Sequence, residues 1–204
     1  MKQKQVVVVV SFLLPLLAFL SNLPLAFSDD ATERVLDVMK NPLETDRQYY
    51  ILPATRGGGL KLAKTGNSEC PLTVLQDSSP YFDGRSIKFI TAGDSSEIRT
   101  GTNLDIEFVN KPKCAKSGKW GVLFDVQIYR PCVVIDGPNS KFQIVKYGAG
   151  YKLMFCFDGG CLDIGRLDAQ NDEDGRRLTP SAPEPFEIVF VEAFEDNNVI
   201  KSVV

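Results

Sequence analysis

The chain has 204 residues, of which 44% are hydrophobic and 24% are charged, a composition typical of a folded protein. Its 23 Lys and Arg residues against 26 Asp and Glu residues give a net charge of -3, which argues against nucleic acid as the main partner. There is no histidine, so Ser-His-Asp and Cys-His triads and His metal ligands are excluded. We expect no metal ion and no other cofactor.

Residues 1–28 have the pattern of a secretory signal peptide. Lys2 and Lys4 form a basic start, an apolar run follows over residues 6–20, and Ala26-Phe27-Ser28 places small residues before a cleavage site. The apolar run is shorter than the roughly 20 residues that a membrane-spanning helix needs. The pattern therefore predicts removal of this segment on export.

Residues 29–204 are expected to form one exported domain. No second apolar run follows the first, so no membrane partner is expected. The secretory pathway would deliver the domain outside the cell or into a vacuole. We expect a monomer.

The rest of the chain reads as short strands separated by turns. Turn residues such as Gly57-Gly58-Gly59 and Asp83-Gly84 recur at intervals of about ten residues, which predicts an all-β barrel or sandwich. Three prolines, Pro112, Pro131 and Pro138, are placed in the connections. The predicted strands are Tyr49–Leu52, Leu72–Leu75, Ser86–Ile90, Leu104–Val109, Gly121–Phe124, Phe142–Val145, Tyr151–Phe155 and Phe186–Val191.

The chain has five cysteines, which in an exported protein predicts two disulfides and one remaining thiol. Cys156 and Cys161 flank a turn segment and are close enough to clip a hairpin. A pair between Cys70 and Cys114 would close a long loop, but spacing alone does not settle the pairing. Cys132 lies in an apolar, strand-like run, which favours a buried free thiol over an intermolecular bridge.

Several short motifs, taken together and in order, resemble the plant Kunitz inhibitors of the soybean trypsin inhibitor family, and the legume members above all. They are Val35-Leu-Asp37, Asn41-Pro-Leu43, Tyr49–Pro53, Gly57–Leu60, Cys70–Gln76, Tyr151–Cys156, Asp163–Gly165 and Arg176–Leu178. The resemblance implies a β-trefoil, with three pseudo-repeats of four strands each. It also implies disulfides Cys70–Cys114 and Cys156–Cys161, with Cys132 outside the pattern.

The same resemblance implies a partner and a site. The family inhibits serine endopeptidases with a loop that enters the protease cleft like a substrate. Spacing relative to the soybean inhibitor places the specificity residue at Asp94, followed by Ser95. The predicted reactive loop comprises Thr91, Ala92, Gly93, Asp94, Ser95, Ser96 and Glu97.

Three departures from the family pattern bear on this site. Trypsin needs a cation in its specificity pocket, and Asp94 would bring a second carboxylate into a desolvated site. Thr45 stands where the family has an Asn that braces the loop, and it has no amide to donate two hydrogen bonds. Lys40 replaces a glycine of the first turn, which predicts a different turn type. We therefore predict weak inhibition of trypsin or none.

Other hypotheses remain open at this stage. The target could be a protease that accepts Asp before the cut bond. Inhibition could use another loop carrying Arg85, Arg99 or Lys64, or could act on a papain-like cysteine protease or a serine carboxypeptidase. Inhibition could also be lost, leaving a storage or defence protein.

Two further classes complete the alternatives. A carbohydrate-binding trefoil would use exposed aromatic residues, with Trp120 and Tyr147 as candidates, although core positions are their commoner place. A glycosidase, such as the fucosidase for which some similar legume proteins are labelled, needs two close carboxylates of different pKa. The acids of 172–174 and 94–97 lie in polar turns and are expected to be solvated, so the sequence indicates a protein that is not an enzyme.

Overall fold

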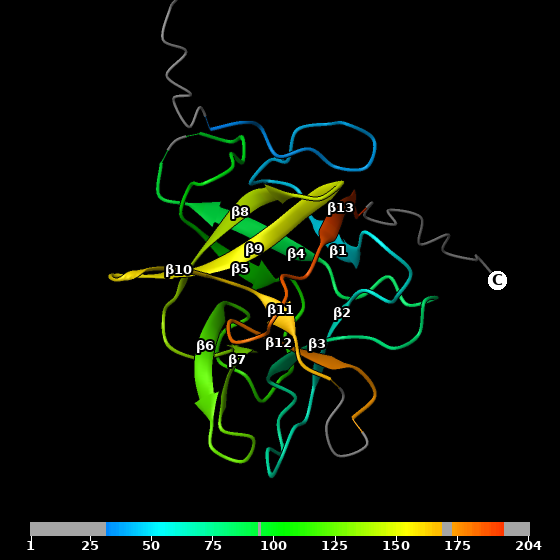
Figure 1. Ribbon diagram of the computed structural model, residues 1–204, viewed down its shortest axis with the longest axis vertical. Coiled ribbons are helices and arrows are strands. Elements are labelled where there is room, and N and C mark those ends of the chain that lie inside the picture. The colour runs from blue at the N-terminus through cyan, green and yellow to red at the C-terminus, as the bar shows by residue number, and fades with distance from the viewer. Residues whose placement is uncertain (1–31, 94, 169–172, 194–204) are drawn as a thin grey trace, which may run out of the picture. The chain divides into compact units, whose positions relative to one another are not determined.

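The computed structural model describes residues 32–93, 95–168 and 173–193, and shows a closed barrel with a layer of hairpins at one end (Figure 1). The barrel strands hydrogen-bond in the order β9-β13-β1-β4-β5-β8, and β8 pairs again with β9 to close the ring. Within the described residues there is no helix, and so none that could span a membrane. The barrel strands are β1 (Tyr49–Pro53), β4 (Ile87–Thr91), β5 (Leu104–Phe108), β8 (Lys141–Tyr147), β9 (Gly150–Phe157) and β13 (Ile188–Glu192).

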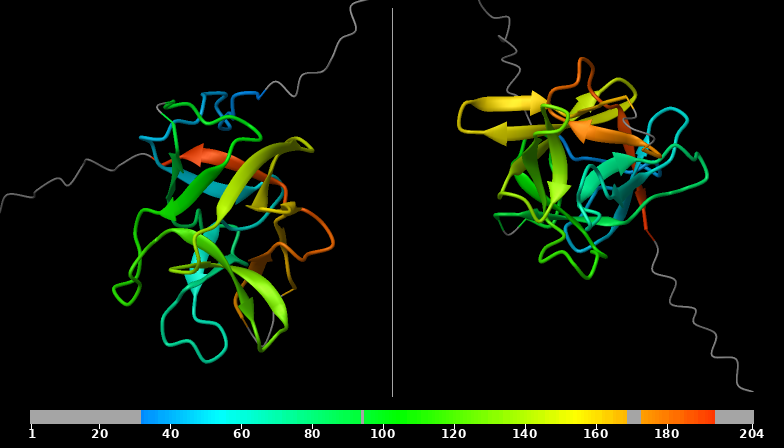
Figure 2. Two further views of the ribbon diagram at one scale, coloured as in Figure 1. Left: turned by 90° about the vertical axis from the view of Figure 1, so that its left-hand side faces the viewer. Right: turned by 90° about the horizontal axis from the view of Figure 1, so that it is seen from below.

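Three hairpins cover the lower end of the barrel, and the view from below in Figure 2 shows them arranged around one axis. Each hairpin lies in the sequence between two barrel strands, so the unit of strand, hairpin and strand occurs three times. This confirms the predicted β-trefoil. The hairpins are β2 (Leu60–Ala63) with β3 (Thr73–Gln76), β6 (Trp120–Asp125) with β7 (Arg130–Ile135), and β11 (Gly165–Arg166) with β12 (Arg176–Thr179).

The barrel interior is filled by every second residue of its strands, as the alternation in the sequence predicts. On β5, Leu104, Ile106 and Phe108 are buried while the two acids between them face outward. Aromatic rings fill the centre, where Phe89 lies 5.7 Å from Phe190 between ring centroids, in an edge-to-face arrangement. Full burial of one such side chain stabilises the fold by about 2–3 kcal/mol.

The structure corrects two features of the predicted strand pattern. β2, β11, β12 and β10 (Gly160–Asp163) were not predicted, because each has at most four residues, which is too short for an alternating pattern to stand out. Pro131 was placed in a connection but is the second residue of β7. It lies next to the hairpin turn, and its carbonyl oxygen accepts a hydrogen bond from the Thr179 hydroxyl at 2.5 Å.

Both disulfides implied by the family resemblance are present. Cys70 and Cys114 join with a Cα–Cα distance of 6.0 Å across 44 residues of sequence, and Cys156 joins Cys161 on the paired strands β9 and β10. The Cys132 thiol is free and buried. Burial raises its pKa, so the thiol is held in its unreactive protonated form.

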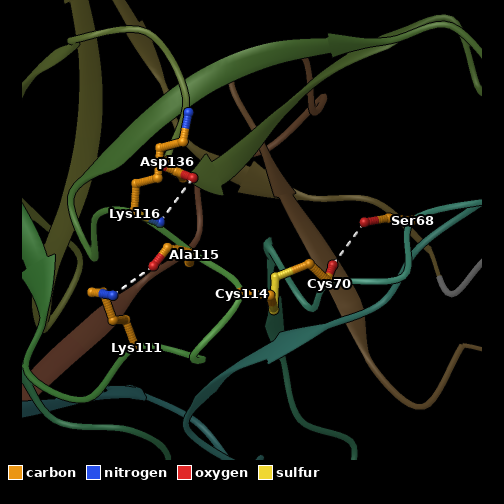
Figure 3. The surroundings of a disulfide bond; sticks show 7 residues. All are labelled: Ser68, Cys70, Lys111, Cys114, Ala115, Lys116 and Asp136. Atoms are coloured by element: carbon orange, nitrogen blue, oxygen red, sulfur yellow. Dashed lines mark hydrogen bonds between the residues drawn. A yellow bond between two sulfur atoms is a disulfide. The ribbon is translucent and has the colours of Figure 1, made fainter.

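Hydrogen bonds between side chains and backbone lie on both sides of the long disulfide (Figure 3). The Ser68 hydroxyl donates to the Cys70 carbonyl at 2.7 Å, on one side of the bridge. On the other side, just after Cys114, the Lys116 amide donates to the Asp136 carboxylate at 3.0 Å. The bridge therefore ties the β2–β3 connection to the segment between β5 and β6.

Candidate functional site

The predicted reactive loop connects β4 to β5 at the upper end of the barrel (Figure 1). Asp94, its proposed specificity residue, lies outside the described residues. Its described neighbours Gly93 and Ser95 are exposed, as are Ala92 and Ser96. The Thr91 hydroxyl lies 3.4 Å from the carbonyl oxygens of both Gly93 and Ser95. The described part of the loop is thus accessible, with Thr91 as the link across its base.

The descending arm of this loop pairs with the N-terminal segment, which runs beside it at the top of Figure 1. The Thr45 amide donates to the Ser96 carbonyl at 2.8 Å, and the Ile98 amide donates to the Leu43 carbonyl at 2.8 Å. Val35 then donates to the Ile98 carbonyl at 2.9 Å. Val35, Leu43 and Ile98 are fully buried, so this arm is fixed to the barrel while the apex projects from it.

Thr45 does brace the loop, but through its backbone. Its amide holds Ser96, whereas its hydroxyl makes no hydrogen bond within the described parts of the chain. Glu44, one residue earlier, donates its amide to the Tyr49 hydroxyl at 2.8 Å and lies opposite Glu97 in a β-bridge. Burial raises the Tyr49 pKa, so the phenol that accepts this hydrogen bond stays neutral.

The first turn keeps a conformation that glycine favours although it carries a lysine. Lys40 has φ of 69°, in the left-handed region. Its amide donates to the Asp37 carbonyl at 3.0 Å, and the Asn41 amide donates to the Asp37 side chain at 2.8 Å. Lys40 therefore adopts the left-handed conformation that a glycine would adopt, at a cost of about 1 kcal/mol, so the prediction of a different turn type is not needed to accommodate the lysine.

Charges at the base of the loop are paired. Glu97 accepts from the Arg34 guanidinium at 3.0 Å and from Arg99 at 3.3 Å. Arg47 bridges Glu44 at 2.8 Å and Glu192 at 2.6 Å, and these two carboxylates raise the Arg47 pKa above its ordinary value. All of these side chains are partly solvated, so water screens the pairs and they contribute little to stability.

A second exposed loop joins β3 to β4 over residues 77–86, and it carries one of the three alternative cations. Arg85 is exposed, and within the described residues its guanidinium makes one long hydrogen bond, 3.4 Å to the Asn110 carbonyl. Lys64 is also exposed, in the β2–β3 connection, whereas Arg99 is half-buried against Glu97.

The backbone around Arg85 is held tightly. The Arg85 amide donates to the Leu60 carbonyl at 2.8 Å, and the Gly59 amide donates to the Phe82 carbonyl at 2.6 Å. A Cβ at Gly59 would lie 2.0 Å from the Asp83 carbonyl oxygen, so only glycine allows this approach. At the tip, Tyr81 is 94% exposed. The glycine motif that suggested the family thus anchors this loop, a role that the sequence reasoning missed.

Among the acids considered for a glycosidase, Glu173 departs from the expected solvated state, whereas Asp174 is exposed as expected. Glu173 is not solvated, because it forms a bidentate pair with the fully buried Arg177, which also binds Asp125 at 2.5 Å. Asp174 pairs with Lys61 at 3.3 Å and with Ser78. Asp172 lies outside the described residues. No two described carboxylates here are left to serve as an acid and base pair.

Of the two aromatic candidates, Trp120 is buried between Phe108 and Phe142 in the core. Tyr147 is 38% exposed at the end of β8, where the Lys152 ammonium lies 5.4 Å from its ring centroid. A single partly covered ring does not form the flat aromatic platform that sugar binding uses. No group of acids and thiols in the described chain is arranged to hold a metal ion.

The chain matches a family model described as trypsin and protease inhibitor, the legume Kunitz family, over residues 35–192. It is 48% identical to Kunitz-type trypsin inhibitor-like 2 protein of Pisum sativum, covering 95% of this chain and 96% of that protein. It is 40% identical to subtilisin inhibitor CLSI-II of Canavalia lineata, covering 82% and 96%.

Solved structures agree with the sequence relatives. A Kunitz-type trypsin inhibitor from Cicer arietinum superposes with a TM-score of 0.74 at 48% identity, covering 79% of this chain and 99% of that one. Soybean trypsin inhibitor in complex with porcine pancreatic trypsin has a TM-score of 0.71 at 29% identity, covering 79% and 100%. Members of this family are protease inhibitors that bind serine proteases such as trypsin, and the chain belongs to the legume Kunitz inhibitor family.

Proposed function

We propose that this protein is an exported, monomeric inhibitor of serine endopeptidases that acts through a substrate-like loop. Family membership over residues 35–192 supports the inhibitory role. The leader pattern of residues 1–28 supports export to the apoplast or the vacuole. Two loops can serve as the bait, and they predict opposite responses from trypsin.

The observation that favours one of them is the exposed Arg85 on a braced backbone. A free guanidinium is the group that a trypsin-like specificity pocket accepts. A loop held by backbone hydrogen bonds at Phe82 and at Arg85 loses little conformational freedom when it enters a protease cleft, which favours tight binding. We therefore propose the bond after Arg85 as the bait, with Tyr81 adding apolar contact area.

The loop at 91–97 stays as the second candidate. Its exposed Gly93, Ser95 and Ser96 and its fixed descending arm support a role in binding. With Asp94 as the specificity residue, trypsin inhibition would be weak and the target would be a protease that accepts Asp before the cut bond. Papain-like cysteine proteases and serine carboxypeptidases are further targets to include in a test.

A protease panel separates the two candidates. The protein, expressed without residues 1–28, is titrated into trypsin, subtilisin, papain, a serine carboxypeptidase and an aspartate-specific subtilase. Inhibition of trypsin at stoichiometric concentration supports Arg85. Inhibition confined to the aspartate-specific enzyme supports Asp94. If no protease is inhibited, the inhibitory function is refuted and a storage or defence role remains.

A further inference from the structure

The hairpin end of the barrel, opposite the predicted reactive loop in Figure 1, contains a cavity of about 280 Å³. It lies between the β2–β3 connection and the β6–β7 hairpin. Its inner wall is formed by Leu72, Cys132 and Val134, of which Cys132 is 1% exposed and Val134 is 8% exposed. The outer face of β7, which would meet water in an ordinary surface hairpin, is thus apolar and faces this cavity.

One side of the cavity mouth, on the β6–β7 hairpin, is apolar, whereas the other side is formed by exposed polar residues of 66–68. Leu123, Phe124 and Val126 line the apolar side and are each more than half exposed, which is unusual for three large apolar residues on one hairpin. The Phe124 ring stacks edge-to-face on Tyr129 across the turn, at 6.5 Å between centroids. A molecule entering here would pass from the apolar side of the mouth to the apolar wall and cover both.

The charged groups of the lining are already partnered. Asp125 binds the buried Arg177 at 2.5 Å, and Asp136 accepts the Lys116 amide at 3.0 Å. The wall therefore offers no cation to an anionic ligand. Because both of its carboxylates already have partners, it also offers no free anion to a cationic ligand. A ligand of this cavity is therefore uncharged.

One buried polar pair of the lining, the hydroxyls of Thr65 and Thr73, can still donate a hydrogen bond. The hydroxyls of Thr65 and Thr73 lie 2.6 Å apart, and both residues are more than nine-tenths buried. One hydrogen bond between them uses only one of their two protons. Within the described residues no other acceptor contacts either hydroxyl, so one O–H is left without a protein acceptor, and both residues line the cavity. A buried donor without an acceptor is costly, and a ligand oxygen would satisfy it.

We propose that this cavity is a binding site for a small neutral molecule with a compact hydrocarbon body and a single carbonyl oxygen, which accepts the free hydroxyl proton of the Thr65–Thr73 pair. A dry cavity of about 150 Å³ in a well-studied protein holds benzene, so the volume here has room for about eleven non-hydrogen atoms. The apolar walls and the apolar side of the mouth bind the body. This site is separate from both inhibitory loops.

Camphor has this size and a single ketone oxygen, and serves as the probe. Titrated into the isotope-labelled protein and followed by nuclear magnetic resonance, it should give saturable shifts confined to the cavity residues. Camphene, a hydrocarbon of similar size without the oxygen, should bind about tenfold more weakly, the value of one hydrogen bond. Camphorsulfonate should not bind, because the wall offers no cation to its charge.

Variants test the assignment of each part. Thr73→Val alone should leave camphor binding intact, since the Thr65 hydroxyl keeps its proton. The double change Thr65→Val with Thr73→Val should weaken camphor about tenfold and leave camphene unchanged. Val134→Phe should fill the cavity and abolish the binding of camphor and of camphene. Leu123→Gln at the mouth should weaken the binding of both, and this variant serves as the test if Val134→Phe does not fold. Protease inhibition by each variant should equal that of the wild type.

Two results would overturn the proposal. Camphor could cause no shifts, or shifts scattered away from the cavity, which would show that the cavity does not bind such a molecule. The double threonine variant could instead bind camphor as tightly as the wild type, which would show that the hydroxyl pair does not recognise the ketone.

Discussion

The two exposed loops on this trefoil, residues 77–86 and residues 91–97, flank the same strand but differ in how they are held and in what they present. The first is pinned near its tip by Gly59 and Leu60 and presents Arg85. The second is fixed along its descending arm by the N-terminal segment and contains Asp94. Spacing relative to the soybean inhibitor predicts the acidic loop as the site, whereas an exposed guanidinium on a braced backbone favours the basic loop.

The largest expected effect is the loss of the basic anchor. Arg85→Ala should weaken trypsin inhibition by about a thousandfold or more, because interfaces of this kind depend on one central side chain. The inhibition constant of the variant measures this directly. Lys64→Ala removes an equally exposed cation from another loop and should change nothing. Equal inhibition by the Arg85 variant and the wild type would remove Arg85 from the site.

The next largest effect concerns the disulfide that encloses both loops. Replacing Cys70 and Cys114 by Ala frees a span of 44 residues and should lower the free energy of unfolding by about 4 kcal/mol. Inhibition should weaken as well, because both loops lie inside this span. Replacing Cys156 and Cys161 should lower it by about 2 kcal/mol, since that bridge spans only 5 residues, and should leave inhibition unchanged. Chemical denaturation and inhibition assays report the two quantities.

A smaller change lies in the turn that precedes the brace of the acidic loop. Lys40→Gly removes the strain of the left-handed conformation but gives the unfolded chain more freedom, so it should raise the free energy of unfolding by less than about 1 kcal/mol. The Thr45 contact to Ser96 lies downstream of this turn, so proteolysis of the 91–97 loop should slow slightly. Destabilisation on thermal unfolding would show that the lysine side chain makes a contribution of its own.

The smallest effect should come from the ion pairs at the acidic loop. Glu97→Gln breaks the contacts to Arg34 and Arg99, both partly solvated, and should cost less than about 1 kcal/mol. If Arg85 is the bait, trypsin inhibition stays unchanged. A marked loss of inhibition in this variant would favour the 91–97 loop instead.

The barrel could be predicted from sequence because its strands alternate, as Leu104, Ile106 and Phe108 show, and because the motifs resemble a known family. The hairpin strands β3 and β6 overlap predicted ones, but β11 and β12 could not be predicted, since two to four residues are too few for a period to appear.

Apart from the two disulfides that the resemblance implied, contacts between residues distant in sequence could not be predicted either. Arg177 pairs with Glu173 four residues before it, but its full burial also depends on Asp125, which lies 52 residues away. The cavity at Cys132 depends in the same way on two connections meeting in space. In the candidate site, exposure of the loop segments could be expected from their turn residues, but the rigidity of each loop depends on hydrogen bonds to Leu43, Thr45, Gly59 and Leu60.

The most direct test is to identify the bond that trypsin slowly cuts in this inhibitor. The protein is incubated with catalytic amounts of trypsin at mildly acidic pH, reduced to open the Cys70–Cys114 bridge that would hold the pieces together, and analysed by mass spectrometry. Our account predicts one new amino terminus at Ser86, generated by cleavage after Arg85. A new terminus after another Lys or Arg, or rapid digestion at many sites without inhibition, would contradict it.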